Sequence, residues 1–275
     1  GPASQRSMAP GGHMFTFRDD TCYTMPAHFG GDAFNPADTR RFNVLTLNYV
    51  FVTERKLLER VVPDVFELVR PEVCIDYCQC REAECLDAGG HNLIQVSAPV
   101  RFRGAHHVTE GGFALVIWAN SAGAMATGRE HYGLPMLHAD IGGLHAEGSR
   151  RSTAASHAGG TFLSLEADML RPVEGDALAE LARVDMNILG WRYIPRLGGP
   201  GAELSQPTLL PQRFEAASVW RCEGTFRWTP PASGDHPHHQ RVVQALTGLP
   251  VIDTRPLLLM QGTSTVFTNK ACVLK

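Results

Sequence analysis

The spacing of apolar and polar residues predicts a chain built mainly from β-strands. Alternating or continuous short apolar stretches, bounded by turn residues, predict strands over residues 45–52, 73–80, 94–102, 113–119, 162–170, 189–194, 216–228 and 256–267. Helical spacing predicts three helices, over residues 53–62, 176–183 and 240–247, the first capped by Thr53 and the last closed by Gly248. Strands do not alternate with helices. The pattern therefore predicts a β-rich α+β fold, a barrel or sandwich with a few outer helices.

The domain organisation is expected to be simple. Residues 1–7 precede Met8 and are interpreted as an expression remnant, and the Gly- and Pro-bearing residues after them are expected to be frayed. We therefore expect a disordered start over residues 1–14 and a single domain over residues 15–275. With 44% hydrophobic residues, a chain of this length can bury a core.

Charge and cysteine usage exclude several classes of partner and indicate a location. A formal net charge of −3 gives no broad attraction to nucleic acid or to an anionic membrane, and no apolar run approaches the ~20 residues of a membrane span. The sequence does not begin with a basic region followed by an apolar core, so we expect no secretory signal. Seven cysteines, an odd count, do not suggest a disulfide framework, so we expect reduced thiols and a cytoplasmic protein.

Four of the cysteines lie close together, at Cys74, Cys78, Cys80 and Cys85. They fit the ligand spacing of a zinc site only loosely, because the first three lie in a predicted strand, and small buried side chains are the favoured interpretation. No metal and no cofactor are predicted. Strand alternation places Asp76 on the same side as Cys74 and Cys78, where burial would raise the pKa of its carboxyl. The alternative is that Asp76 caps a turn or faces solvent.

The stretch from Gly128 to Leu137 carries the most suggestive chemistry. Arg129, Glu130 and His131 follow an apolar run and are costly to bury unless they are paired. The same residue types hold anions and move protons. From these residues alone, two interpretations are possible: an ion pair that locks a loop, or a reactive site. His131, His138 and His145 are interpreted as loop residues, and His236, His238 and His239 as incidental surface residues.

Several segments resemble the acetoacetate decarboxylases. Residues 111–130 (GGFALVIWANSAGAMATGRE) are similar to the family's central strand and Gly-Arg-Glu turn, and residues 23–30 (YTMPAHFG) to its Met-Pro-x-x-Phe-Gly segment. Residues 47–63, 186–195 and 246–266 fit further segments in the family's order. The resemblance implies the fold of these decarboxylases, a small-molecule substrate, a pocket entered by residues 111–130 as a central strand, and a homo-oligomer.

The chain departs from the family where the chemistry matters most. In the decarboxylases a proline and two lysines follow the turn, and the first lysine forms a Schiff base with the ketone. Here Pro135 is followed by Met136 and Leu137, and the whole chain holds three lysines. The resemblance places Asp76 at one family glutamate and Leu93 at a second. It places a family arginine near Val44, with Arg40 and Arg41 close enough to substitute for it, and it places His91 at a family tyrosine.

The first functional hypothesis is an enzyme that acts on a β-keto or polyketide-like carbonyl compound without a Schiff base. It would catalyse cyclisation, dehydration, isomerisation or decarboxylation by stabilising an enolate, in secondary metabolism. Arg129 would clamp an anion, with Asp76, Glu130 and His131 as acid and base. The expected substrate contacts are Met136, Leu137 and Trp118 as an apolar wall, with Leu93, His91 and Tyr132. The alternatives are a non-catalytic small-molecule binder and a decarboxylase that uses Lys270.

Overall fold

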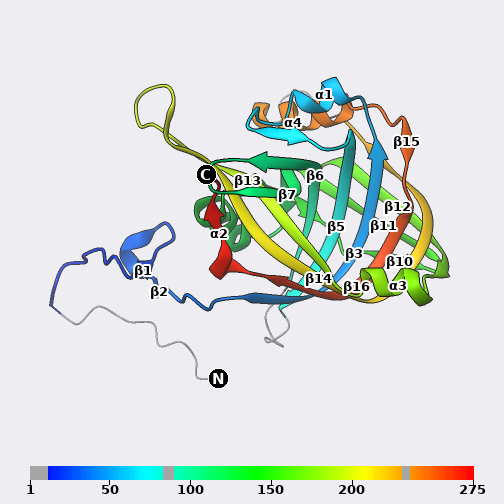
Figure 1. The fold of residues 1–275 in the computed structure, drawn as a ribbon, viewed down its shortest axis with the longest axis horizontal. Helices are drawn as coiled ribbons and strands as arrows, with labels where there is room; N and C mark the ends of the chain where they lie inside the picture. The colour runs from blue at the N-terminus through cyan, green and yellow to red at the C-terminus, as the bar shows by residue number, and fades with distance from the viewer. Residues whose placement is uncertain (1–11, 83–89, 231–235) are drawn as a thin grey trace. The chain divides into compact units, whose positions relative to one another are not determined.

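The computed structural model describes residues 12–82, 90–230 and 236–275 (Figure 1). The chain divides into two compact units, Gly1–Asp38 and Thr39–Lys275. In the first, β1 (Thr21–Cys22) pairs with β2 (Asp32–Ala33) around the short 3-10 helix η1 (Ala27–Phe29). The predicted disordered start extends to residue 14, and its residues 1–11 lie outside the described part of the chain. The single domain expected over residues 15–275 stays a prediction.

The second unit contains all eight strands that the sequence predicts, most of them longer than predicted. The strands that carry the argument below are β3 (Arg40–Val52), β5 (Glu72–Glu82), β6 (His91–Arg103), β7 (Val108–Ala119), β8 (Met136–His138), β12 (Gly160–Pro172), β13 (Val184–Pro195), β14 (Ala202–Trp228) and β16 (Leu257–Val266). The shorter strands are β4 (Phe66–Leu68), β9 (Asp140–Ile141), β10 (His145–Glu147), β11 (Arg150–His157), β15 (Asp253–Thr254) and β17 (Cys272–Val273). The helices are α1 (Arg55–Glu59), α2 (Ala122–Tyr132), α3 (Gly175–Leu181), α4 (Pro237–Thr247) and the 3-10 helix η2 (Thr268–Lys270).

The sheet is mostly antiparallel and is organised by its longest strand. Along the sheet the order is β10-β11-β12-β14-β13-β7-β6-β5-β3-β15, and β16 pairs with both β14 and β3. The 27-residue β14 bends, so that its first half pairs with β13 and its second half with β12. The result is sandwich-like, so of the two predicted architectures the sandwich is observed (Figure 1).

The main core lies on one face of β3, β5, β6 and β7. Leu47, Ile75, Ile94 and Trp118 point to this face and have no exposed surface. Burial of such a side chain stabilises the fold by about 1.5–3 kcal/mol. Because strand side chains alternate, the residues between them point to the opposite face, which carries the polar groups described below.

Two predictions about the middle of the chain were wrong. Residues 111–130 do not form one strand, because β7 ends at Ala119 and α2 begins at Ala122. Ser121 caps this helix by accepting a hydrogen bond from the Ala124 N–H at 3.2 Å, and Gly133 closes it with a φ of 69°. The histidines predicted in loops also differ, since His131 lies in α2, His138 ends β8 and His145 begins β10.

His239 was predicted as an incidental surface residue and is instead buried, with 3% of its surface exposed. It begins the apolar face of α4 that also buries Val243 and Leu246. The Trp118 indole N–H donates a hydrogen bond to His239 Nε2 at 3.1 Å, and the His157 ring stacks on the other side at 4.3 Å between centroids. A buried polar ring is tolerated here because it accepts this bond.

Candidate functional site

A row of side chains crosses five strands on the face opposite the main core. Asn48 on β3 lies opposite Asp76 on β5, which lies opposite Gln95 on β6. The row continues through Ile117 on β7 to Met136 on β8. Directly opposite residues point to the same side of a sheet, so all five share this face. Three strand spacings separate Asp76 from Met136, about 14 Å along the sheet.

Asp76 is a half-buried carboxyl held by two neighbours. Its Oδ1 accepts a hydrogen bond from the Asn48 side-chain amide, and its Oδ2 accepts one from the Cys74 thiol at 3.1 Å. Burial raises the pKa of Asp76, while these two hydrogen bonds to the carboxylate act in the lowering direction. The predicted orientation of Asp76, on the side of Cys74 and away from bulk solvent, is confirmed.

The thiols on this strand are poor nucleophiles. Burial raises the pKa of Cys74 and Cys78 well above the ordinary thiol value, and the charge of Asp76 adds to the effect in both. Burial also raises the pKa of Cys80 to about 12. The reactive form of cysteine is the thiolate, so these groups are kept protonated and unreactive. Cys85, the fourth member of the sequence cluster, lies outside the described residues.

The Arg-Glu-His group sits at the end of α2, beside β8. The Arg129 guanidinium donates a hydrogen bond through Nη1 to the Met136 backbone carbonyl at 2.8 Å. Its side chain is otherwise exposed, whereas Glu130 and His131 are half-buried. Arg129 therefore has donors left for an anion while one donor fastens the helix to the strand.

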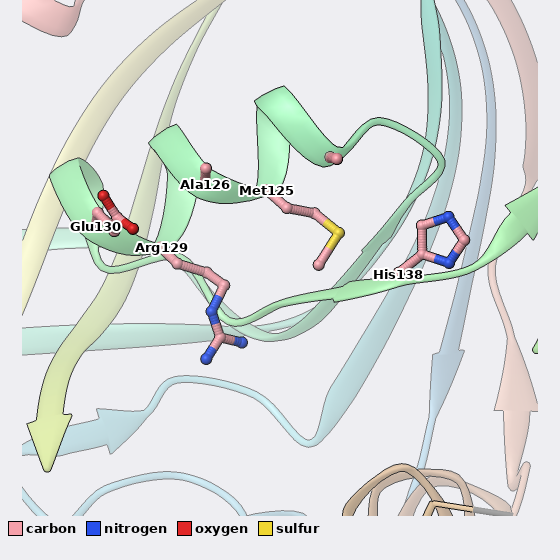
Figure 2. Close-up of a pocket in the computed structure, with 6 residues that line it drawn as sticks. Met125, Ala126, Arg129, Glu130 and His138 are labelled. Carbon is pink, nitrogen blue, oxygen red and sulfur yellow. The ribbon is translucent and has the colours of Figure 1, made fainter. Parts of the chain in front are cut away.

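Arg129 and Glu130 line an open hollow of about 410 Å³ together with Ala122, Met125, Ala126 and His138. Figure 2 shows Met125 extending from α2 between Arg129 and His138. Neither Asp76 nor Met136 lines this hollow. The predicted convergence of Arg129, Glu130 and Asp76 on one cavity is thus not seen in the described part of the chain, and the chemistry is divided between the hollow and the Asp76 face.

Met136 connects the two places. Its carbonyl binds Arg129, and its side chain is buried on the Asp76 face, with 4% exposed. It packs against Gly128 so closely that a Cβ at Gly128 would lie 2.2 Å from the Met136 sulfur. A side chain at residue 128 would therefore require the Met136 thioether to move.

The other predicted contacts divide between the two faces. Leu93 lies opposite Cys78 and His91 opposite Cys80, so both are on the Asp76 face. Trp118 and Leu137 lie opposite each other on the main-core face, because each follows a residue that points the other way. The structure thus separates Trp118 and Leu137 from Met136, with which they were expected to form one wall. Tyr132 packs, partly buried, near Met136 at the end of α2.

All three lysines are exposed, and none of them is on a strand of the Asp76 face. Lys56 is exposed on α1, Lys270 is exposed on η2 with its ammonium 4.7 Å from the Phe267 ring centroid, and Lys275 is the exposed last residue. A Schiff base requires a lysine amine at the reacting carbonyl. Neither the Asp76 face nor the hollow offers one.

Sequence reasoning missed Asn48 and Gln95. Both occupy positions that alternate with buried apolar residues in predicted strands, so a polar residue there indicates only the second face of a sheet. The pairing register of the strands would have identified them, because it places Asn48 and Gln95 on either side of Asp76. This register cannot be read from one sequence. Val44, near which the resemblance places a family arginine, is buried on the same face with 6% exposed.

The described residues hold no candidate metal site. Within residues 12–82, 90–230 and 236–275, no group of three or more His, Cys, Asp or Glu side chains is arranged so that it could hold a metal ion. In the same residues, no helix has both the length and the apolar character needed to cross a bilayer.

Comparison with known proteins assigns the fold and the family. The acetoacetate decarboxylase (ADC) profile matches residues 24–264. Among solved structures, an acetoacetate decarboxylase from Legionella pneumophila superposes with a TM-score of 0.70 at 18% identity, covering 90% of this chain and 92% of that one. The enduracididine biosynthesis enzyme MppR complexed with pyruvate gives 0.66 at 13% identity, covering 94% and 99%. An acetoacetate decarboxylase-like enzyme from Sphingomonas wittichii RW1 gives 0.66 at 12%, covering 89% and 96%. No curated protein matches the sequence significantly.

Proposed function

Because the chain belongs to the acetoacetate decarboxylase family, we propose that it is an enzyme that acts on a carbonyl compound without forming a Schiff base. The family includes decarboxylases, in which an imine between a lysine and the ketone accepts the electrons. In this chain the acceptor would be the substrate's own carbonyl oxygen, which becomes an enolate. Hydrogen-bond donors placed where that charge develops would then replace the imine.

The observation that carries the proposal is the position of the lysines. Met136 is buried on the Asp76 face at the residue where the resemblance places the family's reactive amine, and a thioether cannot form an imine. Lys56 and Lys270 are exposed on α1 and η2 and Lys275 is the exposed last residue, so none of the three is on a strand of the Asp76 face. An imine mechanism would need one of these to reach the face, so a lysine-independent route fits this chain better.

Asp76 is the group best suited to move a proton. Burial raises the pKa of its carboxyl toward the operating range of a general acid or base, and Asn48 and Cys74 fix its orientation. In the ionised form it could take the proton from the carbon next to a ketone. In the protonated form it could donate a hydrogen bond to the enolate oxygen.

The proposed substrate is a β-keto or polyketide-like compound. The face that holds Asp76 also carries Leu93 and Val44 where the family resemblance places charged residues, so it suits a less charged substrate than acetoacetate. Arg129 in the hollow is the proposed anion clamp, with Glu130 and His131 beside it. The biosynthetic role named for MppR agrees with a place in secondary metabolism.

The test is turnover of a panel of β-keto acids and polyketide-like β-diketones by the wild-type protein and by Asp76→Asn. Loss of the product ketone or carbon dioxide in Asp76→Asn, by a factor of roughly a hundred or more, is expected for removal of an acid–base group. Borohydride added during turnover is expected to give no covalent adduct by mass spectrometry.

Lys270→Ala is the matched control for the route through an imine, and it is expected to keep wild-type turnover. A borohydride adduct on Lys270 would contradict the proposal and favour a decarboxylase. Binding without turnover in the wild-type protein would favour the alternative of a non-catalytic binder, which the burial of Met136 at the family's lysine position also suits.

A further inference from the structure

Gln95 is a side chain on the Asp76 face whose hydrogen-bonding groups are not used within the described protein. It lies directly opposite Asp76, so their Cβ atoms are about 5 Å apart. On its other side, on β7, it lies opposite the apolar Ile117. One of its neighbours along the same face of β6 is Leu93. The side chain is half-buried, so its amide is partly accessible.

The contrast with Asn48 makes this amide informative. The Asn48 side-chain amide donates hydrogen bonds to the Cys74 sulfur, at 3.0 Å, and to the Asp76 carboxyl. Asn48 is therefore committed to holding Asp76. Gln95 makes no hydrogen bond to any described residue, although it is as close to Asp76 in the sheet. A partly buried amide without such a bond costs stability, and a ligand that supplies the missing bonds would recover it.

We propose that Gln95 is a substrate-contacting residue that, with Asp76, recognises the enol form of a 1,3-dicarbonyl compound. This inference rests on the proposed function, because it names the substrate class of the same site. Gln95 offers a donor group, its amide NH2, and an acceptor, its amide oxygen, and an enol of a 1,3-dicarbonyl presents a carbonyl acceptor and a hydroxyl donor. A simple ketone presents only an acceptor.

The Asp76 carboxylate takes the proton from the carbon between the two carbonyls. The electron pair of that C–H bond becomes the C=C bond, and the carbonyl π pair moves to oxygen, forming an enolate. The Gln95 amide N–H donates to that oxygen, and protonated Asp76 returns its proton to the oxygen to give the enol. No oxidant, reductant or metal is consumed.

The test is the binding of pentane-2,4-dione, a 1,3-diketone that cannot lose carbon dioxide. Its affinity is measured by calorimetry, and its keto–enol ratio when bound is measured by ultraviolet absorbance. The variant Gln95→Met keeps the length of the side chain and removes both polar groups. The control Gln261→Met makes the same change at an exposed glutamine on β16.

Wild-type and Gln261→Met are expected to bind the diketone with the bound form shifted toward the enol. Gln95→Met is expected to bind about fivefold more weakly, as for one lost hydrogen bond of about 1 kcal/mol, and to leave the keto–enol ratio near its value in water. An unchanged unfolding temperature separates this loss from a folding defect. A second variant, Gln95→Glu, adds a carboxylate beside Asp76 and is expected to weaken binding further.

Equal affinity and an equal enol fraction in wild-type and Gln95→Met would overturn the inference, as would absence of diketone binding by the wild-type protein. The proposed function fails separately. Diketone binding that depends on Gln95, without turnover of any β-keto compound, supports the inference and contradicts the enzyme. Turnover combined with Gln95-independent binding contradicts only the inference.

Discussion

The Arg129 guanidinium donates a hydrogen bond through Nη1 to the Met136 carbonyl, 2.8 Å away. This bond joins the last turn of α2 to the first residue of β8, and so it couples the hollow to the edge of the Asp76 face. The donor belongs to the turn that resembles the decarboxylases, and the acceptor belongs to the residue that the resemblance places at their lysine. A change at Arg129 should therefore act on both places.

Replacing Arg129 by Met should lower the free energy of unfolding by about 1 kcal/mol, because one hydrogen bond is lost while the alkyl stem is kept. If Arg129 clamps a substrate anion, turnover should fall by roughly a hundredfold or more. Urea unfolding and steady-state kinetics measure the two effects. Arg60→Met, at an exposed arginine just beyond α1, is the control and should change neither. Wild-type stability in Arg129→Met would contradict the structural role.

The buried carboxyl should make stability depend on pH. Burial raises the pKa of Asp76 in the folded chain above the value of 3.8 for an exposed aspartate. Between those two values the folded state binds more protons than the unfolded state, so the free energy of unfolding should fall as pH rises through this window. Asp76→Asn cannot titrate and should lack this component of the slope. Urea unfolding of both proteins from about pH 4 to pH 7 measures the difference. Parallel curves would show that Asp76 is not perturbed.

Met136→Lys should restore an amine to the face. Burial disfavours the ammonium and should lower the pKa of the new lysine, which favours the neutral amine that attacks ketones. Incubation with pyruvate and borohydride should give a mass adduct on the peptide that contains residue 136. The wild-type protein is the control and should give none. Failure of the variant to form an adduct, in a protein that still folds, would argue against residue 136 facing a substrate.

Cysteine labelling should follow exposure and pKa. Cys22 and Cys272 are exposed, whereas Cys74 and Cys78 are held protonated by burial and by the charge of Asp76. Iodoacetamide should therefore modify Cys22 and Cys272 first and the strand thiols at least tenfold more slowly, as mass spectrometry of timed samples would show. Denaturation should remove the difference. Early modification of Cys74 would contradict the burial of the Asp76 face.

The strands could be predicted because alternation is a local property. Around Leu47, Ile75 and Ile94, each in its own strand, buried apolar residues recur at every second position, and that period identifies strands β3, β5 and β6. The orientation of Asp76 followed from the same rule. The family resemblance supplied the fold, and the comparison confirms it.

Other features depend on contacts that local patterns do not encode. Ser121 and Gly133 gave end signals for α2, but the apolar run before Ser121 and Gly128 inside the helix favoured a strand followed by a loop. His239 was taken for a surface residue because its partner Trp118 is 121 residues away. For the same reason the contact between Asn48 and Asp76 was not predicted. The two residues are 28 positions apart in the sequence and meet only through the pairing of β3 with β5.

The pairing of β3 with β16 has a consequence for how the protein is made. Residues 40–52 leave the ribosome long before residues 257–266, the partner that covers one edge of β3. Until then β3 presents an unpaired strand edge next to a half-built apolar core, which is a template for wrong pairing with other chains. Nascent chains arrested before residue 257 should therefore depend on a holding chaperone, and release from it should require the last strands to emerge.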